Sequence, residues 1–147
     1  MSGAWINPPP RPSLATCEAA MAAAIECATQ RGLCMAIAIV DSAGRAICLK
    51  RMDDARPVSA DLALAKARVA ATFERATDQL QALVAPGGAA FGAQFHEAGG
   101  AGILPGGLPV QSAAGLLAAV GASGGDRDAD IAVARAACAA LTKDLQE

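Results

Sequence analysis

The sequence predicts an α+β fold in which helices flank an antiparallel sheet of about five strands. Two apolar runs separated by a short turn, within residues 33–51, indicate a β-hairpin. Helical periodicity precedes this hairpin, follows it and returns at the C-terminus. Because paired strands lie between helices, the sheet is expected to be mainly antiparallel, with helices covering one face.

The length of 147 residues predicts one compact domain. We interpret residues 1–12 as a proline-rich arm that only Trp5 could anchor, and residues 13–147 as the domain. No apolar leader and no apolar run of membrane length is apparent. The five cysteines form no C-x-x-C pair. This pattern favours reduced thiols in a cytoplasmic protein over a disulfide framework or a zinc site.

The charge balance argues against nucleic acid as a partner. The net charge is −2, and lysine and arginine form no runs. Aromatic residues make up 3% of the chain, which leaves no set of rings on which unpaired bases could stack. Neither nucleic acid nor a membrane is therefore an expected partner.

The first helix is predicted to begin at Ser13 or its neighbour and to end near Arg31, where Gly32 is a suitable stop. The hairpin follows, with strands over residues 33–40 and 45–51. Its turn begins at an aspartate and contains a glycine, which is typical of a tight turn.

The central helix, predicted over residues 59–76 with Ser59 as N-cap, carries a charge where an apolar side chain is expected. Helical spacing puts Lys66 on one stripe with apolar neighbours a turn away on each side. Its amine could reach solvent along its own stem or pair with a carboxylate. Alternatively it faces a ligand cavity, with a lowered pKa or a bound anion. The stripe consists of Leu62, Lys66, Val69 and Phe73.

Residues 85–110 are dense in glycine, which indicates unusual backbone conformations or a close approach of the backbone to another group. Apolar side chains such as Phe91 favour an ordered loop over a linker. Because no lysine or arginine lies between Arg75 and Arg127, this segment could offer an anion only its backbone N–H groups. The predicted elements here are a short helix over 78–84, strands around 102–104, 108–111 and 116–123, and a last helix capped by residues 124–126.

His96 and Asp41 are further candidates for chemistry. His96 is the only histidine, and it could be a surface residue, an axial ligand of a haem or corrinoid metal, or a general acid/base tuned by Glu97. Asp41 either caps the hairpin turn or lies near Lys66, because the hairpin and the central helix must pack together. No phosphate-binding loop, nucleophile elbow or metal-ligand spacing is apparent.

Four blocks of sequence, in this order and spacing, resemble a known family. They are AIAIVDSAGRAICLKRMDDARPVS, LALAKARVAATF, APGGAAFG, and GGLPV followed by AAVGASGGDRDADIAVARAA. Over residues 13–141 the set is similar to the haem-degrading, GlcG-like family, which includes HbpS and the C-terminal domain of PduO-type proteins.

The resemblance implies a profilin-like α+β layout, assembly into dimers or larger rings, and haem or a related tetrapyrrole as the ligand. The ligand would lie between sheet, central helix and glycine segment, with His96 as the candidate metal ligand. Asp41 falls on the V-D-x-x-G turn of the family, and Lys66 on its K-A position. The residues implied for this cavity are Lys66, Gly87, Gly88, Phe91, His96, Gly99, Gly100, Gly106 and Gly107.

Three functional hypotheses follow. The first is a small haem- or tetrapyrrole-binding protein. The second is a cofactor-independent isomerase or lyase that moves protons on a small carbonyl compound, with Lys66, His96, Glu97 and Asp41 as candidate catalytic residues. It is favoured by the loop sequence QFHEAGG, where relatives often have Q-H-[TS]-N-G-G. The third is a scaffold subunit of an enzyme complex.

Overall fold

The structure, a computed structural model, describes residues 10–95, 101–143 and 145. Within these residues, four strands form one sheet in the order β2-β1-β4-β3, and every neighbouring pair is antiparallel. In chain order the elements are α1 (Leu14–Gln30), β1 (Ala36–Asp41), β2 (Ala46–Arg51), α2 (Val58–Phe73), α3 (Thr77–Val84), η1 (Ala93–Phe95), η2 (Ala101–Ile103), β3 (Gly107–Ser112), β4 (Gly115–Ser123) and α4 (Arg127–Lys143). The predicted α+β fold with an antiparallel sheet flanked by helices is confirmed.

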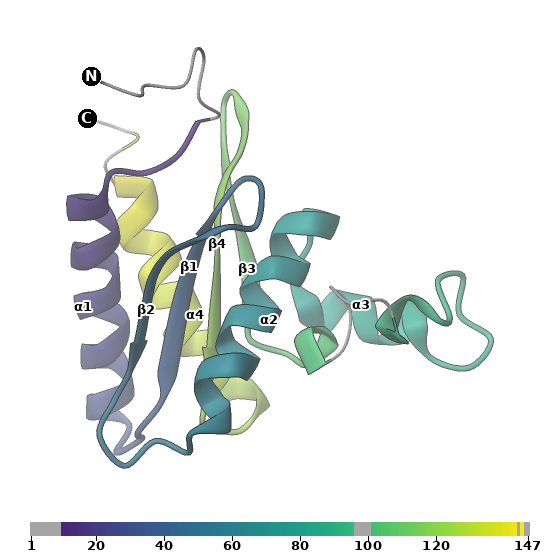
Figure 1. Ribbon diagram of the computed structural model, residues 1–147, viewed down its shortest axis with the longest axis horizontal. Helices are drawn as coiled ribbons and strands as arrows, with labels where there is room; N and C mark the ends of the chain where they lie inside the picture. The colour runs from purple at the N-terminus through teal and green to yellow at the C-terminus, as the bar shows by residue number, and fades with distance from the viewer. Residues whose placement is uncertain (1–9, 96–100, 144, 146–147) are drawn as a thin grey trace, which may run out of the picture.

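Helices pack on both faces of the sheet, so the prediction that they cover one face is wrong (Figure 1). The alternating side chains of β1 show why. Ile37 and Ile39 pack with α1 and α4, whereas Ala38 and Val40 pack with α2. All residues of β1 except the last are buried. A strand that is apolar on both sides requires cover on both sides.

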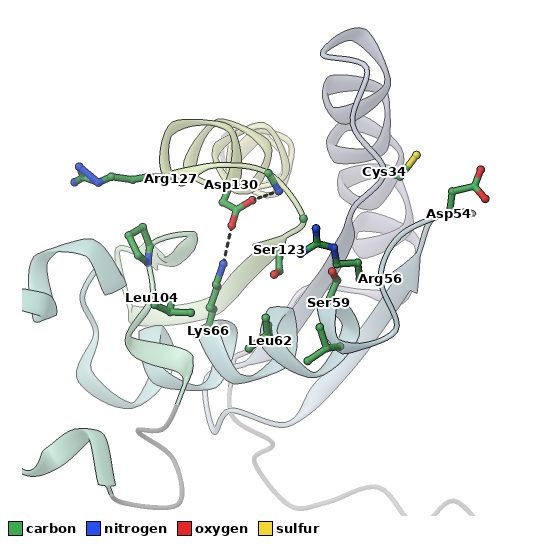
Figure 2. Close-up of a pocket in the computed structure, with 14 residues that line it drawn as sticks. Cys34, Asp54, Arg56, Ser59, Leu62, Lys66, Leu104, Ser123, Arg127 and Asp130 are labelled. Carbon is green, nitrogen blue, oxygen red and sulfur yellow. Dashed lines mark hydrogen bonds and ion pairs between the residues drawn. The ribbon is translucent and has the colours of Figure 1, made fainter.

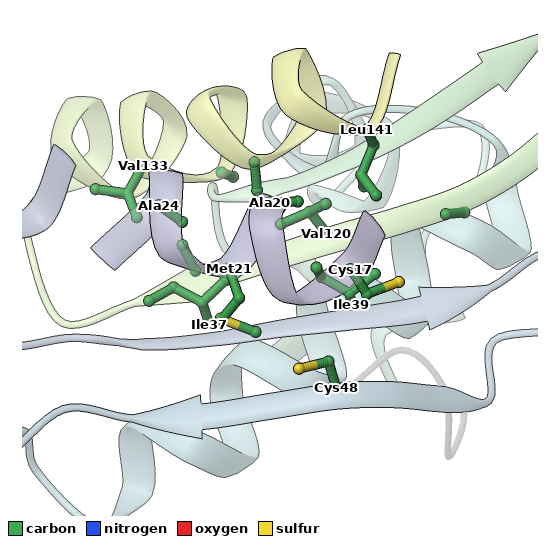
Figure 3. Packing of buried hydrophobic residues seen from close by; sticks show 14 of the residues in the cluster. Cys17, Ala20, Met21, Ala24, Ile37, Ile39, Cys48, Val120, Val133 and Leu141 are labelled. Atoms are coloured by element: carbon green, nitrogen blue, oxygen red, sulfur yellow. The ribbon is translucent and has the colours of Figure 1, made fainter. Parts of the chain in front are cut away.

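The larger core lies between the sheet and the pair of helices α1 and α4 (Figure 3). Met21 of α1 and Leu141 of α4 are buried there against Ile37, Ile39 and Val120 of the two central strands. Burial of side chains of this size contributes roughly 1.5–3 kcal/mol each. The core thereby fixes α4 against the sheet, and with it the first turn of α4, which forms part of the site described below.

The limits of the first and last helices follow from local hydrogen bonds. The hydroxyl of Ser13 accepts a bond from the backbone N–H of Thr16 at 3.1 Å, and Gly32 has φ +68° just after the last turn of α1. Before α4, the side chain of Asp126 accepts a bond from the N–H of Ala129 at 2.8 Å. The predicted beginning and end of the first helix and the cap of the last one are confirmed.

The expected fifth strand does not form. Residues 102–104 were predicted to be extended, but Ala101–Ile103 form a turn of 3-10 helix, η2. Gly102 lies so close to α2 that a Cβ atom there would be 2.5 Å from the carbonyl oxygen of Ala65 and from Val69 Cγ2. This segment therefore packs on a helix instead of on a sheet edge.

Helix α2 differs from its prediction at its start and in the face that it buries. It begins one residue before Ser59, after Pro57, so that Ser59 is not the N-cap. Phe73 is 39% exposed and Leu62 is half-buried, whereas small side chains make the contact with the sheet. Small residues allow the helix backbone to approach β4 closely. The alanines in this contact are Ala63, Ala67, Ala70 and Ala71.

Residues 1–9, which hold most of the predicted N-terminal arm, lie outside the described residues. In the part of the chain that the structure describes, no helix has both the length and the apolar character needed to cross a bilayer.

Candidate functional site

A cavity of about 550 Å³ lies between α2, the connection from β4 to α4, and the residues that lead into β3 (Figure 2). Its volume falls within the range of small-molecule sites. The lining residues come from parts of the chain that are far apart in sequence, and the packing of α2 and α4 on the sheet brings them together. They are Cys34, Asp54, Arg56, Val58, Ser59, Leu62, Lys66, Leu104, Pro105, Ser123, Gly124, Gly125, Arg127 and Asp130.

Lys66 is buried at the wall of this cavity, with 2% of its surface exposed. Its Nζ atom donates to Asp130 Oδ2 at 2.8 Å and to the carbonyl oxygen of Ala122 at 2.9 Å. Of the arrangements expected for this side chain, snorkelling to solvent is therefore wrong. The amine pairs with a carboxylate and also borders a cavity.

Asp130 lies in the first turn of α4 and holds two elements together. Besides the ion pair with Lys66, its Oδ1 atom accepts a hydrogen bond from the backbone N–H of Gly125 at 2.8 Å. Burial raises the pKa of the Asp130 carboxyl above its ordinary value, against the opposing hydrogen bond from Lys66. This aspartate ties α2 to the loop between β4 and α4.

Two glycines of the predicted set stand directly beside Lys66. Gly106 has φ +117°, and a Cβ atom there would lie 2.6 Å from the carbonyl oxygen of Ala122 and 3.2 Å from Lys66 Nζ. A Cβ atom at Gly107 would lie 2.5 Å from the backbone oxygen of Lys66. A side chain at Gly106 would clash with the partners of the lysine amine, and one at Gly107 would clash with the backbone of Lys66, so both positions require glycine.

The other predicted site residues lie elsewhere. Gly87, Gly88 and Phe91 belong to the segment after α3, which extends away from the sheet (Figure 1), and none of them lines the cavity. Phe91 is 57% exposed. The remaining predicted residues, His96, Glu97, Gly99 and Gly100, lie outside the described residues.

Asp41 lies at the far end of the sheet from Lys66. Its Oδ1 atom accepts hydrogen bonds from the N–H groups of Ala43 and Arg45, both at 2.9 Å, so it caps the hairpin turn. Asp41 faces Ala118 across the strands, whereas Lys66 bonds to Ala122. Ala118 and Ala122 are four residue steps apart along β4, which correspond to about 13 Å. The structure does not bring Asp41 and Lys66 together.

The polar wall of the cavity includes residues that the sequence analysis did not assign to a site. Ser59 and Ser123 are 3% and 5% exposed, and their hydroxyls make no hydrogen bond within the described part of the chain. Arg56 is exposed at the rim and likewise has no ion pair among the described residues. Arg127 contacts Asp78 at 3.3 Å. The wall thus carries donors that face the cavity.

The described residues offer a metal single donor side chains and no cluster of them. Within residues 10–95, 101–143 and 145, no group of three or more His, Cys, Asp or Glu side chains could hold a metal ion. Cys34 is the cavity-lining side chain with a sulfur donor.

Cys34 is expected to react first among the five cysteines, all of which are free. Its thiol is exposed, whereas burial raises the pKa of Cys17 to about 11 and that of Cys138 to about 12, which suppresses their reactive thiolate forms. Titration of the native protein with DTNB should show one fast thiol per chain, and Cys34→Ser should remove it. A fast phase that survives in this variant would contradict the assignment.

The chain is similar in sequence to proteins that are already known. A family model described as "Haem degrading protein HbpS-like" matches residues 13–139. Corrinoid adenosyltransferase PduO of Salmonella typhimurium is 35% identical over 119 residues, which are 81% of this chain but 35% of that protein's length. The chain therefore spans about a third of PduO.

Solved structures of other proteins share the fold. The Klebsiella pneumoniae protein ORFY superposes with a TM-score of 0.87 at 29% identity, over 97% of each chain. A PduOC complex with haem superposes with a TM-score of 0.83 at 33% identity, over 88% of this chain and 94% of the other.

Proposed function

Because the chain belongs to the HbpS-like family of haem-degrading proteins, we propose that it binds haem or a related tetrapyrrole in the cavity beside Lys66. The observation that carries the proposal is the lining of this cavity, which combines apolar side chains with cations. The haem complex of PduOC, a structure with 33% identity to this chain, supports the same class of ligand.

The apolar part of the lining suits a flat macrocycle. Val58 and Leu104 are large apolar side chains that are about half exposed at the cavity, and Leu62 lies beside them, half-buried. Exposed apolar surface next to a cavity is typical of a site that a ligand covers. A tetrapyrrole bound here would remove these side chains from water.

The charged part of the lining suits the carboxylates of such a ligand. Arg56 and Arg127 lie in the lining, and a guanidinium can bind a carboxylate through two parallel hydrogen bonds. Lys66 is already paired with Asp130, so Arg56 is the better partner for a propionate. In this proposal the Lys66–Asp130 pair holds the wall of the site.

The metal ligand of the proposal is His96, with Cys34 as the alternative. Haem iron is held by His, Cys, Met or Tyr side chains. Cys34 is the residue of this kind in the described lining, and His96 is the predicted donor from the sequence. Bound haem would supply a redox-active iron, while the protein supplies the pocket and the charges around it.

Haem titration tests the proposal. The native protein should shift and sharpen the Soret band at a ratio of one haem per chain, and Arg56→Gln should weaken binding about tenfold. Arg68→Gln, a change on the exposed side of α2 away from the cavity, is the matched control. We also propose that the chain forms a homo-oligomer, as the resemblance to the family implies, and light scattering on the same samples should show a dimer or a larger assembly.

Spectra of single variants distinguish the two metal ligands. His96→Ala should move the Soret band if His96 holds the iron, and Cys34→Ser should move it if the thiolate does. A protein that leaves the haem spectrum unchanged, or that binds haem equally well in both arginine variants, would contradict the proposed site.

A further inference from the structure

The polar side of the cavity holds hydroxyl groups that the described protein leaves without partners. Ser59 and Ser123 are both more than nine-tenths buried, and both line the cavity. Among the described residues, every side-chain nitrogen or oxygen that is fully enclosed has a hydrogen-bond partner. The hydroxyls of Ser59 and Ser123 have no partner in this part of the chain, so they are not fully enclosed and open into the cavity that they line. Because buried hydroxyls are nearly always hydrogen-bonded, a ligand in the cavity is expected to supply hydrogen-bond partners for these two.

Lys66 offers a third donor at the same place. An ammonium group has three N–H donors, and the hydrogen bonds to Ala122 and Asp130 use two of them. Lys66 lines the cavity, so its remaining N–H can reach a ligand there.

The fold makes these groups converge. Ser59 and Lys66 are two turns apart on the same face of α2, and a long helical side chain points back toward the N-terminus of its helix. Ser123 directly follows Ala122, whose carbonyl oxygen accepts from Lys66. In Figure 2 the guanidinium of Arg56 is directed toward Ser123. Four donor groups, from Arg56, Ser59, Lys66 and Ser123, therefore line the same side of the cavity.

The charge of this part favours an anion. Asp130 is occupied by Lys66 and Gly125, and Asp54 lies exposed at the rim. Arg56 has no ion pair among the described residues, and its planar fork matches a carboxylate. Leu62 supplies an adjoining apolar surface for a short carbon chain.

We infer that the cavity contains a binding site for a small 2-oxo or 2-hydroxy carboxylate. The carboxylate accepts hydrogen bonds from Arg56 and from the hydroxyls of Ser59 and Ser123. The oxygen on the adjacent carbon accepts the third N–H of Lys66. This inference does not depend on haem binding, since it uses the unpartnered donors and no metal ligand.

Three related probes test each part of the inference by calorimetry on the full chain. Pyruvate carries both the carboxylate and the 2-oxo group, propionate lacks the 2-oxygen, and pyruvamide lacks the charge. Pyruvate should bind at least about tenfold more tightly than either analogue, because a buried donor without an acceptor is costly. Equal binding of pyruvate and propionate would overturn the role of Lys66.

Variants of the wall test the placement. Arg56→Gln should weaken pyruvate binding about tenfold and Ser123→Ala about three- to tenfold, while Arg68→Gln should leave it unchanged. None of the three substitutions adds side-chain volume, and thermal melting checks that the variants fold. Absence of pyruvate binding to the native protein, or equal binding by Arg56→Gln and Arg68→Gln, would overturn the inference.

The same samples separate this inference from the proposed function. Binding of haem without binding of pyruvate would support the tetrapyrrole site and overturn the carboxylate site. A protein that binds pyruvate, with the expected loss in Arg56→Gln, supports the carboxylate site even where the haem spectrum does not change.

Discussion

Replacing Asp130 by alanine is expected to lower the free energy of unfolding by about 3–5 kcal/mol, because it leaves a buried charge without its partner. The Nζ atom of Lys66 would keep the carbonyl of Ala122 as its acceptor but lose the carboxylate at 2.8 Å. The variant also loses the acceptor for the N–H of Gly125, which fixes the loop before α4. Urea denaturation of the native and variant proteins measures the difference.

A double variant separates the effect of charge from the effect of packing. Lys66→Met combined with Asp130→Leu removes both charges and places an apolar side chain at each of the two positions. Replacement of a whole buried ion pair by apolar side chains is often close to neutral, so this protein should be more stable than Asp130→Ala. If Asp130→Ala costs less than about 1 kcal/mol, Lys66 reaches solvent and the description of the site is wrong.

The local parts of the fold were predictable from neighbouring residues. Ser13 and Gly32 mark the two ends of α1 through side-chain capping and a positive φ angle, and both effects act within one turn. The hairpin of β1 and β2 likewise follows from two apolar runs around the turn at Asp41. Such signals depend only on residues that are near one another in the sequence, which is why the sequence alone was sufficient to predict these elements.

The parts of the fold that were wrongly predicted depend on distant contacts. The apolar pattern at residues 102–104 is compatible with a strand, and only the closeness of Gly102 to α2 makes it a turn of η2. Alanines look neutral in a helical pattern, yet they form the face of α2 that packs on the sheet. Tertiary packing decided both cases.

One residue of the candidate site, Lys66, was predictable from the sequence, whereas the residues that accompany it were not. Lys66 stood out because a charge on an apolar stripe requires a partner or a cavity, and the structure provides both. Its partner Asp130 is 64 residues away and had an adequate local explanation at a helix N-terminus. Ser59 was similarly assigned to capping, although its hydroxyl faces the cavity. Because each of these two residues had a sufficient local role, the sequence offered no reason to assign it a contact with a distant part of the chain.

Gly121→Ala is expected to destabilise the protein by about 3 kcal/mol, at the upper end of the range for overpacking. Gly121 lies in β4 under α2, and a Cβ atom there would overlap the carbonyl oxygen of Ala63 and lie 2.7 Å from the backbone nitrogen of Ala67. Both atoms belong to the helix backbone, so no side-chain rotation can relieve the clash. The helix must move away from the sheet.

Movement of α2 would also carry Lys66 away from its partners, because Ala63 and Ala67 flank it on the same helix. Gly121→Ala should therefore lose ligand binding in the cavity as well as stability. Gly115→Ala is the matched control: it has φ +111° but no atom within 4 Å of the added Cβ, so it costs only the backbone strain of about 1–2 kcal/mol and leaves binding intact. Equal destabilisation by the two variants in urea denaturation, with unchanged ligand binding in both, would show that the contact between α2 and β4 does not position the site.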